Sequence, residues 1–144
     1  MIRFYSVGDE FGEFSNFAAY PIKLDGAVWP TSEHYFQAQK FKDPRIQAKI
    51  RKAKTPMIAA RMGRDRSKPL RRDWESVKVQ VMDKALRAKF TQHTELAELL
   101  LSTGDEPLVE HTSNDAYWGD GGDGSGKNKL GHSLMRLREA LREG

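Results

Sequence analysis

Cysteine is absent from the 144 residues of this chain. The absence excludes disulfides, a thiol nucleophile, iron–sulfur clusters and thiolate zinc sites. The four histidines, His34, His93, His111 and His132, show no paired spacing on one helical face. We therefore expect no metal site and assign no histidine as a ligand or a base.

Long apolar runs are also absent. The longest ones span only a few residues, whereas a membrane-spanning helix needs ~20. The first residues, Met1 to Ser6, lack the apolar run of a secretory signal. Together with the missing cysteines, these observations predict a cytoplasmic protein without membrane association.

The composition is that of a globular protein. Hydrophobic residues make up 38% and charged residues 31%, which suffices for a packed core. The length suits one domain, and no linker or repeat divides the chain, so we predict a single domain over residues 1–144. The net charge of +4 favours anionic partners, either phosphorylated metabolites or nucleic acid.

The secondary structure pattern changes after the first thirty residues. Aromatic residues interrupted by glycine and proline indicate short strands and turns there, and Asp25-Gly26 predicts a hairpin over residues 23–29. Later patterns predict helices over about 32–42, from Pro44, over 56–62 and over 73–90, with a brief strand at 107–110. Two further helices are predicted, one capped by Thr94 and ending near Gly104, the other after Asn128 as its cap. The predicted fold is mainly α-helical with a small β element near the N-terminus.

A polar stripe marks the helix predicted at 32–42. Glu33, Gln37 and Lys40 are spaced i, i+4 and i+7, which stacks them along one side. A carboxylate can act as general acid or base, and a desolvated lysine can form a Schiff base with a sugar carbon. A solvated stripe stabilised by polar contacts is an equally good interpretation of the spacing.

The glycine-rich segment over residues 115–131 is the most distinctive part of the chain. Its glycine spacing resembles dinucleotide and phosphate loops, but no βαβ unit surrounds it and Asn128 replaces the magnesium-binding hydroxyl residue. A calcium loop would need a glutamate that is missing. The segment is either a flexible connector or a site where Trp118 stacks on a planar base beside Asp120.

Two further features fit either a site or ordinary structure. The segment Phe14-Ser15-Asn16-Phe17 frames a hydroxyl and an amide with rings, as a ligand site or a capped turn would. A basic run attracts phosphate or forms a solvated face; it contains Arg61, Arg64, Arg66, Lys68, Arg71 and Arg72.

Four strings in this order resemble the NADAR family of YbiA-like N-glycosidases over essentially the whole chain. They are Phe14 to Phe17, Trp29 to Lys40, Trp118 to Gly121, and Gly126 to Gly131. The resemblance implies a mainly helical fold and hydrolysis of the C1–N bond between a ribose and a base, with no cofactor. Its described substrates are phosphoribosylamino-pyrimidine intermediates of riboflavin synthesis and, for some members, ADP-ribosylated guanine, so ADP-ribosylated nucleic acid is a further candidate partner.

The resemblance also implies site residues. It makes Lys40 a Schiff-base nucleophile, Glu33 a proton shuttle, and Asp120 a group that orients the ribose or activates water. The implied substrate-binding residues are Ser15, Asn16, Phe17, Trp29, Gln37, Trp118, Gly119 and Asn128. The alternative function is a non-catalytic module that binds a nucleotide, ADP-ribose or nucleic acid.

Overall fold

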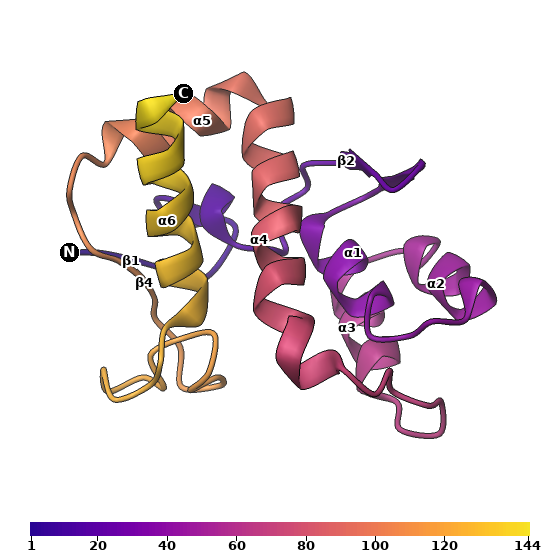
Figure 1. Ribbon diagram of the computed structural model, residues 1–144. Coiled ribbons are helices and arrows are strands. Elements are labelled where there is room, and N and C mark those ends of the chain that lie inside the picture. The colour runs from indigo at the N-terminus through magenta and orange to yellow at the C-terminus, as the bar shows by residue number, and fades with distance from the viewer. The chain divides into compact units, whose positions relative to one another are not determined.

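A computed structural model describes all residues from 1 to 144 and shows six α-helices with four short strands (Figure 1). The strands form two separate two-stranded sheets. The helices are α1 (Ser32–Ala38), α2 (Pro44–Arg51), α3 (Pro56–Arg64), α4 (Trp74–Gln92), α5 (Thr94–Ser102) and α6 (Lys129–Glu143). The strands are β1 (Ile2–Phe4), β2 (Ile22–Leu24), β3 (Ala27–Trp29) and β4 (Leu108–Glu110), and a 3-10 turn spans Gly12–Phe14. The mainly α-helical prediction is confirmed.

The chain forms two compact units, and α4 runs from one into the other. The first unit contains residues 1–18 and 90–144, and the second contains residues 19–89. No helix combines the length and the apolar character that crossing a membrane requires.

The second unit opens with the predicted hairpin. Strands β2 and β3 pair antiparallel, with Ile22 opposite Trp29. Asp25 and Gly26 form the turn with φ values of 54° and 78°, the left-handed conformation that a two-residue hairpin turn requires. The indole Nε1 of Trp29 donates to the carbonyl of Leu24 at 3.0 Å, which ties the hairpin together.

Helix α1 starts as predicted but ends early. Its first turn is capped by Thr31, whose hydroxyl accepts from the backbone N–H of His34. The helix ends at Ala38 instead of residue 42, because tighter turns follow and bring the buried ring of Phe41 into the core. Lys40 therefore lies in the turn after the helix.

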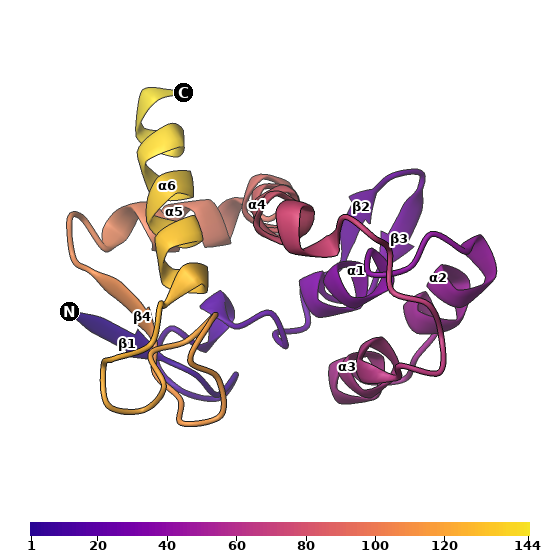
Figure 2. The same cartoon turned by 60° about the horizontal axis from the view of Figure 1, so that its bottom comes forward.

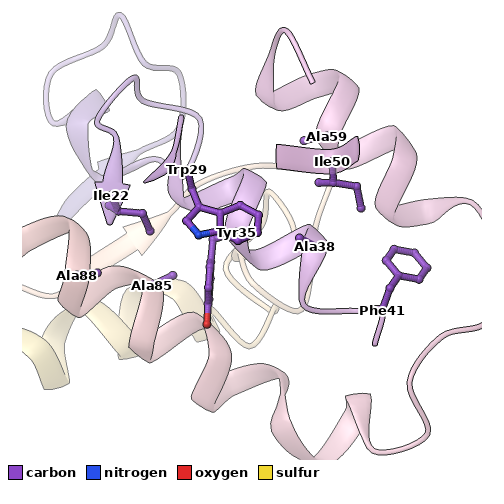
Figure 3. Close-up of a cluster of buried hydrophobic side chains, with 9 residues drawn as sticks. All are labelled: Ile22, Trp29, Tyr35, Ala38, Phe41, Ile50, Ala59, Ala85 and Ala88. Atoms are coloured by element: carbon purple, nitrogen blue, oxygen red, sulfur yellow. The ribbon is translucent and has the colours of Figure 1, made fainter. Parts of the chain in front are cut away.

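The core of the second unit lies among α1, α2, α3 and the hairpin. Helix α1 packs against α2, α3 and β3, an arrangement visible in Figure 2. Proline at the first helical position and a side-chain cap from the preceding residue start both α2 and α3. Figure 3 shows the cluster that results, with Ile22, Trp29, Tyr35, Ala38, Phe41, Ile50, Ala59, Ala85 and Ala88 buried.

The first unit is built on a parallel pairing of β1 and β4, with α6 packed on β4 and α5 packed on α6. The ring of Phe14 is fully buried and contacts Phe4, Phe11 and Phe90. The predicted strand at 107–110 is confirmed as β4.

Two predicted helix caps in the first unit are wrong. Thr94 is the first residue of α5, and the cap position before it is occupied by His93, whose side chain makes no capping bond. Asn128 does precede α6, but its side chain does not cap that helix. Its amide reaches β4 instead, where it donates to the carbonyl of Leu108 and accepts from the N–H of Glu110.

Candidate active site

The carboxylate of Glu33 lies in the first turn of α1 and is only 8% exposed. Its Oε2 accepts a hydrogen bond of 2.7 Å from Nε2 of Gln37, one turn further along the helix. The N-terminal end of a helix favours a negative charge. The structure therefore holds a buried carboxylate in a defined orientation, which is what a general acid or base needs.

The side chain of Gln37 is 5% exposed and fills the space between α1 and α3. Its Oε1 is buried and has no hydrogen-bond partner. Leaving a buried acceptor unpaired costs about 1–3 kcal/mol. The unpaired oxygen of Gln37 therefore lowers the stability of the fold, while the nitrogen of the same amide donates to Glu33.

Lys40 lies close enough to Glu33 for their charges to interact. The pKa of the Lys40 amine is lowered to about 8, first by burial and then by the positive charges of Arg66, Arg64 and Lys78, while Glu33 acts in the opposite direction. With that pKa, about one amine in ten is neutral at pH 7. A neutral lysine amine is a nucleophile.

Aromatic rings border Lys40. Its Nζ lies 5.9 Å from the ring centroid of Phe36. That ring in turn meets Trp74 edge-on, with 5.1 Å between centroids. The ring of Phe36 thus contributes to the burial that lowers the pKa of the Lys40 amine.

Trp29, also predicted to bind substrate, is a core residue in this structure. Its ring is 5% exposed and stands edge-on to Tyr35 with centroids 5.3 Å apart. The second unit thus brings Glu33, Gln37 and Lys40 together and places Trp29 in the packed cluster of Figure 3.

In the first unit, Asp120 is an anchor of the glycine-rich loop. Its Oδ1 accepts from the backbone N–H groups of Thr112 and Gly122 at 3.1 and 2.9 Å, and its Oδ2 lies 2.8 Å from Nδ1 of His111. The hydrogen bond from His111, followed by the two backbone bonds, lowers the pKa of Asp120. Asp120 is therefore an ionised acceptor, which orients other groups better than it donates protons.

The side chain of His111 lines an open polar pocket of about 600 Å³. The other lining side chains include Arg3, Asp120, Lys127, Asn128 and His132. The sequence did not single out His111, because its partner Asp120 lies nine residues further along the chain. Neither helical nor strand periodicity predicts a contact at that spacing.

Trp118 and Gly119, the two residues before Asp120, are held by contacts within the loop. The carboxylate of Asp115 accepts from the N–H of Trp118 at 2.8 Å, and the indole of Trp118 is half-buried and edge-on to Tyr117. A Cβ at Gly119 would lie 2.9 Å from the carbonyl oxygens of both Glu110 and Asp115, so only glycine fits there.

The predicted residues near the N-terminus also lie in the first unit. Ser15 and Asn16 are buried, and Phe17 is partly buried. The hydroxyl of Ser15 accepts from the N–H of Phe17 at 3.1 Å, which is the capped turn that the sequence allowed. Nowhere in the structure are three or more histidine or carboxylate side chains grouped to hold a metal ion.

The chain matches the NADAR domain family over residues 3–142. It belongs to that family. The protein "N-glycosidase YbiA" of Escherichia coli strain K12 is 69% identical over 141 residues, which cover 98% of this chain and 88% of that protein. The "Riboflavin biosynthesis protein VVA0006" of Vibrio vulnificus is 47% identical over 142 residues, covering 99% of this chain and 39% of that protein.

A solved structure has the same fold. The NMR structure of Escherichia coli YbiA matches with a TM-score of 0.92 and 68% identity, over 99% of this chain and 84% of that chain. The resemblance to the NADAR family and the predicted N-glycosidase activity, a hydrolase activity on N-glycosyl bonds, are thereby confirmed. The roles of individual site residues stay predictions.

Proposed function

We propose that Lys40 and Glu33 carry the N-glycosidase activity of this protein. The observation that carries the proposal is the buried Lys40 amine, whose pKa of about 8 makes it available near neutral pH, beside the oriented carboxylate of Glu33. A nucleophile activated by desolvation and a general acid within the same unit are the two groups that a Schiff-base route requires.

The reaction follows from these two groups. A ribosylamine opens its ring to an imine, and the neutral amine of Lys40 adds to C1. Glu33 takes the proton that the Lys40 nitrogen loses on addition and delivers it to the nitrogen of the base. The C1–N bond then breaks, the free base leaves, and an imine remains between C1 and Lys40. The remaining lysine imine is hydrolysed by water, which releases the sugar and restores the amine.

The proposed substrate is a phosphorylated ribosylamino-pyrimidine. The relative in Vibrio vulnificus is named a riboflavin biosynthesis protein, which favours a pyrimidine of that chemistry over ADP-ribosylated guanine. The cationic side chains that act on Lys40, namely Arg64, Arg66 and Lys78, suit a substrate that carries a phosphate. The predicted base stacking by Trp118 and the predicted cytoplasmic location stay predictions.

The test is incubation with a phosphoribosylamino-pyrimidine or with ADP-ribosylated guanosine in metal-free buffer, followed by mass spectrometry. We expect free base from the first substrate. Release from the second alone would place the protein in reversal of base modification. Binding of both without cleavage would support the non-catalytic module and contradict the roles of Lys40 and Glu33.

The covalent step has its own test. Borohydride added during turnover should trap a sugar adduct on wild-type protein and on the Lys54→Ala variant, because Lys54 is exposed. The Lys40→Ala variant should yield no adduct. Wild-type turnover without any trappable adduct would instead indicate direct attack by water. Full activity in Glu33→Gln would remove the proton-shuttle role.

A further inference from the structure

The orientation of the Gln37 amide follows from its partner. The amide nitrogen of Gln37 donates to Oε2 of Glu33 at 2.7 Å. The oxygen of the amide then points the other way, where it is buried without a hydrogen-bond partner. The bond to Glu33 thus decides how the whole side chain lies.

Gly63 of α3 makes room for this orientation. A Cβ built on Gly63 would lie against Oε1 of Gln37, 2.7 Å from its Cδ and 3.0 Å from its Cβ, and these are the three nearest atoms. The φ of Gly63 is not positive, so its backbone does not require glycine. Alanine has a higher intrinsic helix propensity than glycine, so propensity alone would favour alanine at this position. The glycine is therefore explained by the close approach of Gln37.

We propose that Gly63 and Gln37 are positioning residues: Gly63 leaves the space that Gln37 occupies, and Gln37 holds the carboxylate of Glu33 in its working orientation. The inference rests on the proposed function of Glu33. It also reassigns Gln37, which the resemblance made a substrate contact, to a role that acts through another residue. Helices α1 and α3 pack together, so the contact between Gln37 and Gly63 belongs to the packing between these two helices.

A double-mutant cycle tests the coupling. We expect Gly63→Ala to lower kcat by about tenfold with little change in KM, because the orientation of a proton-transfer group is lost and substrate binding is kept. In a Gln37→Ala background the same substitution should cost less than about twofold, since most of the clashing atoms are gone. Equal losses in both backgrounds would overturn the proposal.

A second measurement does not depend on activity. The ¹³C signal of the Glu33 carboxyl reports its titration, and in Gln37→Met its midpoint should move to higher pH because a donor to the charged form has been removed. Gln80 is an exposed glutamine of α4, so Gln80→Met is the matched control and should leave the midpoint unchanged. An unchanged midpoint in Gln37→Met would overturn the proposal even if Gly63→Ala failed to fold.

The two inferences fail in different ways. If Glu33→Gln is fully active but the midpoint moves in Gln37→Met, the positioning contact is real and Glu33 is not the proton shuttle. If Glu33→Gln is inactive and neither Gly63→Ala nor Gln37→Met changes kcat, the proposed function stands and the positioning role is wrong.

Discussion

Nδ1 of His111 lies 2.8 Å from Oδ2 of Asp120, and the carboxylate of Asp120 accepts two further bonds from the backbone of its own loop. Because an ionised carboxylate has no proton to give, the bond requires a proton on Nδ1 of His111. When His111 is neutral, its Nε2 is therefore an acceptor. Asp120 thus determines the tautomer of His111, a histidine that lines a polar pocket.

Asp120→Asn should reverse the tautomer of neutral His111. The asparagine oxygen can keep the backbone bonds of Thr112 and Gly122, while its NH₂ faces His111 and turns Nδ1 into an acceptor. We expect the ¹⁵N shifts of neutral His111 to change from the Nδ1–H to the Nε2–H tautomer, with His132 unchanged as an internal control. Retention of the Nδ1–H tautomer would show that another group orients the ring.

Lys40→Met should raise stability at pH 7 by about 1 kcal/mol. The folded pKa of Lys40 is about 8, below the ordinary 10.5, so folding opposes protonation and the full penalty is present at pH 7. The partly exposed position reduces that penalty from its nominal size. The advantage of the variant should shrink between pH 8 and 10.5, as chemical denaturation at several pH values would show. Lys54→Met, on an exposed side chain, should show no such advantage.

Arg66→Ala should move the pH dependence of activity. If the neutral amine of Lys40 is the nucleophile, kcat/KM rises with pH and levels off above about 8, the pKa of Lys40. After burial, the charge of Arg66 is the largest cause that lowers this pKa. Its removal should shift the rise to higher pH by about half a unit, since an exposed guanidinium is screened. Arg61→Ala is the control, because Arg61 is an exposed residue of α3 and Arg66 follows the end of that helix. A shift to lower pH in Arg66→Ala would contradict the assignment.

Asn128→Ala should lower the stability of the protein by about 2 kcal/mol. The substitution removes both amide bonds to β4 and places alanine at a φ of 50°, which glycine and asparagine adopt more easily. Asn128→Gly keeps the backbone conformation and should cost less. Thermal unfolding of both variants separates the two effects, and unchanged stability in Asn128→Ala would show that the two amide bonds to β4 do not stabilise the fold.

The C-terminal end of α1 could not be predicted from the local sequence. Thr31 and the Asp43-Pro44 pair define the ends of the segment, and the residues between them have a helical pattern. The helix nevertheless stops at Ala38, since burial of Phe41 and tighter turns prevail over local propensity. The predicted stripe therefore consists of two helical residues followed by Lys40 in a turn.

The sequence by itself determined the elements whose causes are local. The Asp25-Gly26 turn, the proline that starts α2 and the Thr55-Pro56 pair that starts α3 act within a few residues, so they can be identified without coordinates. Only the tertiary structure decided which groups meet across the chain: Gln37 against Gly63, His111 against Asp120, and the charges around Lys40. Burial and close approach depend on packing between segments distant in sequence, and no periodicity along the chain records them.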